Sequence, residues 1–493
     1  MSDLPPEEAP STPTTPPTAT TPPQQPARPG ATRNRLFRVA MGMVAGLCVY
    51  YAYVWEGRDT SQLYQGLVMF VLAAVPTLQW AYRAETTFPL MEAFLLTSAN
   101  TYALPLLTGH ESLQLYPDTV ISTTANAVIV YELCAILAYN LTPGRPGRKE
   151  FWTAEVISEE YSRFLSYGMT ATNVYTFATT FFYDEIFSRL PRESEGILRA
   201  VFFGLSIICT FITCRRWGQG TIRRQEKNIF LVNLVLLFVF LASSLYLISG
   251  LSIITLALLG YISGSHKVPW LPLAVVIPVI SVLHHGKSQM RDYYWTENPG
   301  HVLRFTELPS FYVQWFRFGL QREEGEKHAT AKLLERTSLF HILCLVVSQT
   351  PERQPYLYGD TYRQIPGQFI PRFFWPDKPG AQVSTNRLSL YYGLQTEEDT
   401  KSTSIGFGMV SEAFANFGFL GVGLIGGFFG FAFKKVSVWT RLSPMLSYGG
   451  LLLVLLMAWS FQTELTLSVW LSSLFQACVA VLGTPFVLRK VLG

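Results

Sequence analysis

The most constraining feature of this sequence is a series of apolar runs, each long enough to cross the roughly 30 Å hydrocarbon core of a bilayer as a helix. Hydrophobic residues make up 49% of the chain and charged residues only 15%, which is too apolar for a soluble protein of this length. The sequence therefore predicts an all-α polytopic membrane protein with about 12 transmembrane helices. The expected spans are 36–55, 62–82, 88–108, 119–140, 163–183, 197–214, 228–245, 248–264, 269–284, 405–433, 445–461 and 465–487.

One apolar run, 228–264, is too long for a single ordinary span. We divide it at "LISGLS" (247–252), because serine and glycine permit a tight hairpin. A single tilted helix here would invert every segment that follows.

The distribution of Lys and Arg predicts the orientation of the spans. With the N-terminus in the cytoplasm, basic clusters follow even-numbered spans at 145–149, 215–227, 434–435 and 489–490, as the positive-inside rule requires. Both termini are then cytoplasmic. The predicted organisation is a tail (1–32), transmembrane helices 1–9 (33–284), a large outer loop (285–404) and transmembrane helices 10–12 (405–493).

Composition also bears on disorder, disulfide bonds, metal binding and nucleic-acid binding. Ten prolines within the first 30 residues, with little that could be buried, predict a disordered tail. The six cysteines include no C-x-x-C pair, so neither a disulfide framework nor a zinc site is indicated. A net charge of +4 gives no support to nucleic-acid binding.

The long loop 285–404 combines cationic and aromatic side chains. The segments 311–320 and 335–347 carry apolar residues at helical spacing, which predicts amphipathic helices lying against the membrane surface. Guanidinium and ammonium groups suit phosphate oxygens, and aromatic rings stack on sugar faces, so the loop predicts a phosphorylated, sugar-bearing ligand. The candidate phosphate-binding residues are Arg336, Arg363, Arg372 and Lys378, and the candidate sugar-binding residues are Tyr358, Tyr362 and Trp375.

The span that follows this loop contains an intramembrane carboxylate. Glu412 and Asn416 are four residues apart, which places them on one face of a helix near its outer end. A charged residue inside a membrane segment is costly and is therefore a functional candidate, here facing a wet cavity. We include Asn416 among the sugar-binding candidates. The small residues from 418 to 430 are expected to allow another helix to approach closely.

Three motifs carry a resemblance to a known family. "YLYGDTY" (356–362), "FIPRFFWPDKP" (369–379) and "SEAFANFGFLG" (411–421) together resemble the bacterial oligosaccharide repeat unit polymerases, the Wzy-type O-antigen and exopolysaccharide polymerases. The resemblance implies a multi-helix enzyme of the bacterial inner membrane with a large periplasmic loop. It also implies undecaprenyl-diphosphate-linked oligosaccharide as substrate, catalytically important arginines in the loop, and a chain-length regulator and a flippase of the same pathway as partners.

Glycosyl transfer from a diphosphate needs two kinds of group. Fixed cations stabilise the charge that develops on the leaving diphosphate, and a carboxylate or imidazole takes the proton of the attacking hydroxyl. The proton acceptor is expected among Glu412, Asp377 and His341. No acidic cluster for a divalent cation is evident, so neither a metal nor another cofactor is expected.

Structural roles and other functions remain open for the same residues. Arg372, Asp377 and Lys378 could form a turn-fixing ion pair, His341 could be structural, and Glu412 could belong to a helix start. Glu464 could line the site or end a helix. Two functions compete with polymerisation: a ligase that transfers finished polymer to another acceptor, and a transporter or flippase for the lipid-linked unit.

Overall fold

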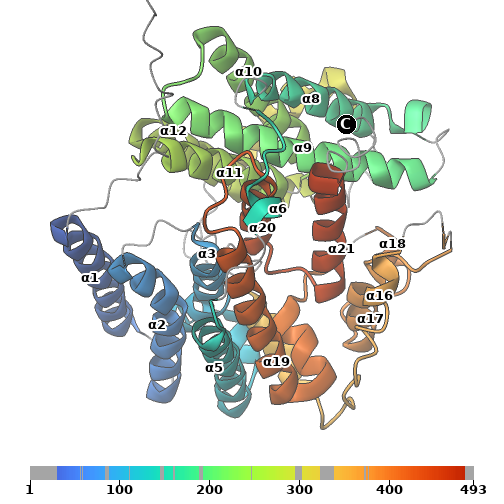
Figure 1. The fold of residues 1–493 in the computed structure, drawn as a ribbon. Coiled ribbons are helices and arrows are strands. Elements are labelled where there is room, and N and C mark those ends of the chain that lie inside the picture. Colours follow the sequence, from blue (N-terminus) through green and yellow to red (C-terminus); the bar gives the residue numbers. More distant parts are fainter. Residues whose placement is uncertain are drawn as a thin grey trace, which may run out of the picture.

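The computed structural model describes residues 30–483, apart from 56, 58, 84–87, 110, 145–148, 159–161, 188–191, 246, 292, 295–302, 322–337, 371–373, 376 and 403. The described residues form helices and connecting segments, with no β-strand among them (Figure 1). The all-helical architecture predicted from the sequence is confirmed. Most of the predicted tail, 1–32, lies outside the described residues.

The helices follow the apolar runs closely, and the part of the chain that the structure describes also has the π-helical segments η1, η3 and η6 and the 3-10 turns η2 and η5. The N-terminal part holds α1 (Gly30–Val54), α2 (Thr60–Arg83), α3 (Leu90–Ser98), η1 (Ala99–Ala103), α4 (Leu104–Leu107), η2 (Glu111–Leu115), α5 (Asp118–Leu141) and α6 (Lys149–Thr153). The middle holds α8 (Leu165–Phe181), η3 (Tyr183–Phe187), α9 (Arg192–Gly218), α10 (Arg224–Ala242), α11 (Leu247–Ser265), α12 (Trp270–Arg291), η5 (Phe305–Glu307), α13 (Leu308–Leu320) and α15 (Leu339–Gln349). The C-terminal part holds α16 (Ile365–Gln368), α17 (Val383–Tyr391), α18 (Asp399–Ser402), α19 (Met409–Trp439), α20 (Tyr448–Ser460), α21 (Leu467–Cys478) and η6 (Val479–Gly483).

Within the described residues, every predicted span coincides largely with helix, but the helices differ in length. Among the described residues, seven helices are long and apolar enough to cross a membrane, and several others are shorter apolar helices. The chain is therefore a membrane protein with several spanning helices, while the total of twelve stays a prediction. The seven segments are Phe37–Val54, Thr60–Arg83, Asp118–Leu141, Val201–Gly218, Arg224–Ala242, Trp270–Lys287 and Met409–Trp439.

The long apolar run 228–264 is divided into two helices, as predicted. The break lies between Ala242 and Leu247, just before the "LISGLS" segment in which we expected it. Leu245 takes a left-handed conformation with φ 60°. Gly250 serves a different purpose, because a side chain there would lie 2.9 Å from the ring of Phe238 on the neighbouring helix. The glycine of this motif therefore permits close packing of the hairpin and does not form its turn.

The directions of packed helices agree with the predicted alternation of spans. Gly426 and Gly430 of α19 pack against the carbonyl oxygens of Tyr131 and Ala135 of α5, where no side chain would fit. These contacts run in the same order along both helices, so α5 and α19 are parallel, as expected for two even-numbered spans. They also confirm close helix packing at these two small residues.

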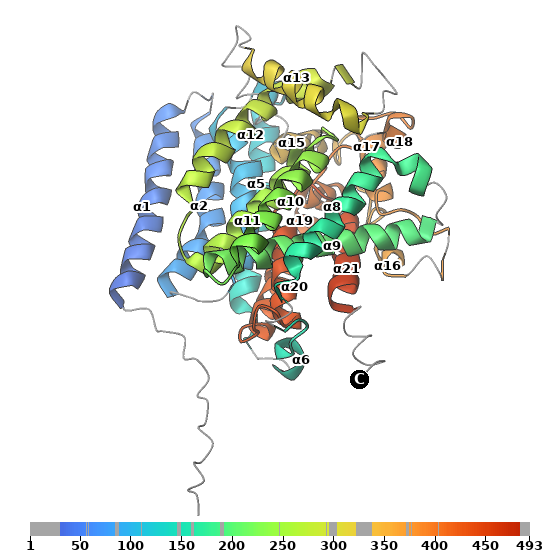
Figure 2. The same cartoon turned by 90° about the horizontal axis from the view of Figure 1, so that it is seen from above.

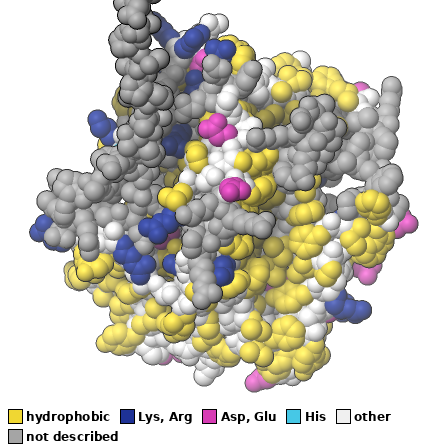
Figure 3. Space-filling model, in the orientation of Figure 1, with side chains coloured by type: hydrophobic (Ala, Val, Ile, Leu, Met, Phe, Trp, Pro, Cys, Tyr) yellow, Lys and Arg dark blue, Asp and Glu magenta, His cyan; other side chains and the backbone are white. Residues whose placement is uncertain are grey.

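The helices form two packed groups. One contains α1, α2, α3, α5 and α19, and the other contains α8 to α11, to which the α12–α13 pair is joined by the Tyr312 hydroxyl, which donates to the Val239 carbonyl of α10 at 2.6 Å. In both views, α9 lies crosswise to α1 and α2 (Figures 1 and 2). On the face shown in Figure 3, apolar side chains cover much of the lower half, over α2, α5 and α19. This apolar surface suits contact with lipid tails.

The two amphipathic helices predicted in the long loop are present as α13 and α15, but their surroundings differ. α13 packs on α12, where the Trp315 indole N–H donates to the Leu283 carbonyl at 2.6 Å. α15 packs between α5 and α19, and its Phe340, Leu343 and Cys344 side chains are fully buried. The expectation that α15 lies against the membrane surface is wrong, because its apolar face completes the protein core.

Candidate functional site

Helix α19 is broken near its N-terminal end. Phe417 and Gly418 depart from helical geometry, and Gly418 has φ 59° and ψ −141°. A side chain at Gly418 would lie 2.8 Å from the Tyr356 hydroxyl, so both the backbone and the space require glycine. The break separates a short segment, 409–416, from the long remainder of the helix. Breaks of this kind inside membrane helices are found where backbone is buried in protein or lines a cavity.

At this break, hydrogen bonds from the loop 356–363 replace the regular hydrogen bonds of the helix. The Leu357 N–H donates to the Ala415 carbonyl at 3.0 Å, and the Tyr358 N–H donates to the Asn416 carbonyl at 3.2 Å. The break therefore leaves neither carbonyl without a donor, as burial in an apolar region demands.

Asn416 fastens the same loop through its side chain. Its amide oxygen accepts from the Gly359 N–H at 2.9 Å, and its amide nitrogen donates to the Thr361 hydroxyl and the Glu412 carbonyl, both at 2.8 Å. The last contact confirms that Glu412 and Asn416 share one helix face. The amide that the sequence assigned to sugar binding is fully buried and is used within the protein to position the loop.

Glu412 is fully buried at the start of α19. Its Oε2 accepts from the Leu467 N–H, the first of α21, at 2.7 Å, so the carboxyl group joins the positive ends of two helix dipoles. Its Oε1 has no hydrogen-bond partner among the described residues, with the Thr361 hydroxyl close by. The expectation that Glu412 faces an open wet cavity is wrong for this conformation, because the loop 356–363 and α21 cover it.

A second acidic residue, Glu464, packs beside the segment that leads into α19. The Gly408 N–H donates to the Glu464 carbonyl at 2.9 Å, and the Gly408 carbonyl accepts from the Glu412 N–H at 3.1 Å. Burial raises the pKa of Glu464. The backbone of Glu464 packs against the segment leading into α19, and the two roles that the sequence left open for its side chain, lining the site or ending a helix, stay predictions.

Tyr362 connects this buried region to the surface. Its ring stacks on Phe417, at 6.4 Å between centroids. Burial, and secondarily the nearby Glu412 carboxyl, raise the pKa of Tyr362 above that of a free phenol. The Tyr362 hydroxyl therefore stays protonated and can donate a hydrogen bond. Its neighbours in sequence point to different places: Thr361 bonds Asn416 in the interior, and Arg363 is exposed.

Arg363 and the indole of Trp375 line a cleft of about 440 Å³ on this surface. Asp360 lies at its edge and pairs with two guanidinium groups, at 3.3 Å from Arg387 Nε and 3.8 Å from Arg363 Nη1. Because these pairs are exposed, they add little to stability and leave the guanidinium groups accessible to an anion. The full lining is Asp360, Arg363, Gln364, Pro366, Gly367, Ile370, Trp375 and Pro379.

Lys378, another predicted phosphate-binding residue, turns toward the protein. Its ammonium donates to the carbonyl oxygens of Ile370, Gln368 and Gly367, at 2.7, 3.1 and 3.4 Å. A cation held by three carbonyls fixes the turn that forms the cleft wall. The turn-fixing role considered from the sequence is therefore supported for Lys378, through backbone contacts.

None of the other predicted site residues that the structure describes lines this cleft. Asp377 is exposed and does not line the cleft. Tyr358 is 73% exposed, and it stands beside Tyr356 at 6.1 Å between ring centroids. His341 lies on α15, with its ring 5.6 Å from that of Tyr116. Arg336 and Arg372 lie outside the described residues.

Sequence reasoning missed two features of the site. Thr361 and the Leu467 backbone both contact the Glu412–Asn416 pair, and neither belongs to a residue type that signals chemistry. It also passed over Glu132, a fully buried carboxylate of α5 that accepts from the Ser98 hydroxyl at 2.7 Å. A lone acidic residue within a predicted span was a usable signal for Glu132.

Metal chemistry finds no support among the described residues, where no group of three or more His, Cys, Asp or Glu could hold an ion. Comparison with protein-family models, with curated proteins and with solved structures finds no match to this chain.

Proposed function

We propose that this chain polymerises undecaprenyl-diphosphate-linked oligosaccharide repeat units at the periplasmic face of the bacterial inner membrane. The observation that carries the proposal is a fully buried carboxylate, Glu412, with one oxygen left unbonded, covered by a loop that ends at Arg363, one of the residues lining a surface cleft with Trp375. A carboxylate, a guanidinium and an aromatic ring are the groups that glycosyl transfer from a sugar diphosphate would use.

The reaction has one bond made and one broken. A hydroxyl at the non-reducing end of the new lipid-linked unit attacks the anomeric carbon of the growing chain, and the bond from that carbon to the diphosphate oxygen breaks. In this scheme the hydroxyl proton passes to Glu412 Oε1, and undecaprenyl diphosphate leaves with its negative charge facing Arg363. Trp375 would hold a sugar ring against its face. Tyr362, protonated and beside Glu412, would orient the acceptor hydroxyl by donating to it.

This mechanism requires the loop 356–363 to open, because Glu412 is fully buried. The hydrogen bonds that hold the loop are those to Ala415 and Asn416, and Gly359, with φ 90°, lies between them. A loop held by a few such bonds can open at modest cost and then exclude water when it closes.

A transporter of the same lipid-linked unit is the second candidate. The broken helix α19, with its short N-terminal segment, is a feature shared with secondary transporters, in which half-helix ends face the substrate. The exposed cations and the aromatic cleft on one surface favour the polymerase over this alternative, since a transporter needs polar groups along a path through the membrane.

A deletion strain tests the proposal. Loss of the polymerase should abolish long chains but leave single repeat units attached at the cell surface. Loss of a ligase would instead leave polymer bound to its lipid carrier, and loss of a transporter would leave lipid-linked units on the cytoplasmic side. Either of the latter two patterns would overturn the proposal.

A further inference from the structure

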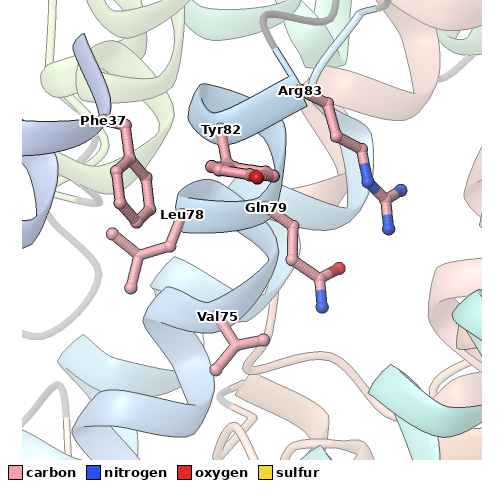
Figure 4. Close-up of a pocket in the computed structure, with 6 residues that line it drawn as sticks. All are labelled: Phe37, Val75, Leu78, Gln79, Tyr82 and Arg83. Carbon is pink, nitrogen blue, oxygen red and sulfur yellow. The ribbon is translucent and has the colours of Figure 1, made fainter. Parts of the chain in front are cut away.

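A second cavity, unrelated to the proposed site, lies at the seam between α1 and α2. Its volume is about 300 Å³, and its apolar floor is formed by Phe37, Val75 and Leu78. Tyr82, Gln79 and Arg83 complete the lining. Figure 4 shows Phe37 and Leu78 close together, with the polar ends of Gln79 and Arg83 extending on the other side of Tyr82.

The surroundings of α1 show what this cavity faces. None of the candidate span Phe37–Val54 is buried within the protein, and α1 lies at the edge of the helix assembly (Figures 1 and 2). An apolar helix with so little protein contact is surrounded by lipid. The apolar part of any occupant of the groove is therefore a hydrocarbon chain.

The polar end of the groove is cationic. The rings of Phe37 and Tyr82 meet edge to face at 5.3 Å, which brings the start of α1 and the end of α2 to the same membrane boundary. Arg83 is in the last turn of α2, and the exposed Arg38 follows Phe37 on α1. On the predicted orientation, this boundary is the cytoplasmic one.

We propose that the α1–α2 groove binds an anionic glycerophospholipid of the bilayer, with one acyl chain against Phe37, Val75 and Leu78 and the phosphate at Arg83. Basic pockets between membrane helices on the cytoplasmic side bind anionic head groups in this way. Guanidinium and phosphate form charge-assisted, bidentate hydrogen bonds, and Gln79 adds an amide donor within reach of the head group. The proposal does not depend on the polymerase function.

Native mass spectrometry of the purified full-length chain tests this site. We would compare phosphatidylglycerol with phosphatidylcholine carrying the same acyl chains, which differ in net charge. The wild-type chain should retain phosphatidylglycerol in preference, and Arg83→Gln should weaken that binding by about 10- to 150-fold, the loss expected when a hydrogen bond to a charged group is removed. Leu78→Trp, which fills the groove, should weaken the binding of both lipids.

Arg441→Gln is the matched control, because Arg441 is an exposed arginine on the same predicted side, outside the groove. It should bind phosphatidylglycerol as the wild type does. Equal retention of the two lipids by the wild type would overturn the proposal, as would an Arg83→Gln variant that binds phosphatidylglycerol normally. An equal loss in Arg83→Gln and Arg441→Gln would show nonspecific surface attraction and would overturn it too. Elution volume and helical circular dichroism establish that each variant is folded.

Discussion

Replacing Asn416 with alanine should release the loop that covers Glu412. The side chain makes three hydrogen bonds, to the Gly359 N–H, the Thr361 hydroxyl and the Glu412 carbonyl, all at 2.8–2.9 Å. Two of these bonds, to Gly359 and Thr361, hold the loop, and each contributes about 0.5–1.5 kcal/mol net, so their loss should lower the free energy of opening the loop by about 1–3 kcal/mol. The fold of the membrane helices should be unaffected, because opening is local.

Hydrogen exchange measures this opening directly. A reduction of about 1–3 kcal/mol corresponds to roughly 5- to 150-fold faster exchange for amides in 356–363, where exchange reports the opening equilibrium. Asn140→Ala is the matched control, since Asn140 is an exposed asparagine whose amide makes one local bond, to the Ile136 carbonyl. That variant should leave exchange in the loop unchanged. Unaltered exchange in Asn416→Ala would refute the argument that Asn416 holds the loop closed.

Three further predictions concern the backbone and the topology. Gly418→Ala should destabilise the protein by at least about 1–2 kcal/mol, because the φ of Gly418 is 59°. The control Gly427→Ala, on the same helix, should be neutral or slightly stabilising, because a side chain there meets open space. Equal unfolding midpoints for the two variants would contradict this prediction. Lys378→Met should speed proteolysis of the cleft wall, since three carbonyls lose their donor, and an unchanged cleavage rate would argue against that role. Reporter fusions should place Asp360 outside and Gly220 inside, and a cytoplasmic signal at Asp360 would reverse the assigned orientation.

Much of the fold could be predicted because membrane helices are encoded by composition over whole segments. The apolar runs became helix, and the division of 228–264 into two helices was predicted, although the break lies just before the Ser and Gly residues that suggested it. The position of α15 could not be predicted, since an apolar helix face suits either a membrane surface or a protein core. Its burial follows from the shapes of α5 and α19, which meet it only in the folded chain.

The candidate site, like the fold, could be predicted from the sequence only in part. Glu412 was found because a lone carboxylate in an apolar span is costly, and its pairing with Asn416 follows from helical spacing. The break at Phe417–Gly418 was hidden in an unbroken apolar run, because it is determined by the loop that packs into it. The partner of the Glu412 carboxylate was equally hidden, since it is the backbone N–H of Leu467, and any residue but proline could supply that group.

The most direct test of the proposed function is the glycan profile of cells that carry Glu412→Gln in place of the wild-type chain. Glutamine keeps the shape and an oxygen for the Leu467 N–H but cannot take a proton, so loss of a general base should slow the reaction roughly 100- to 10,000-fold. The variant should reach the membrane at the wild-type level, make no long polymer and accumulate lipid-linked single units. Polymer of wild-type length and amount from this variant would contradict the account and remove Glu412 from the mechanism.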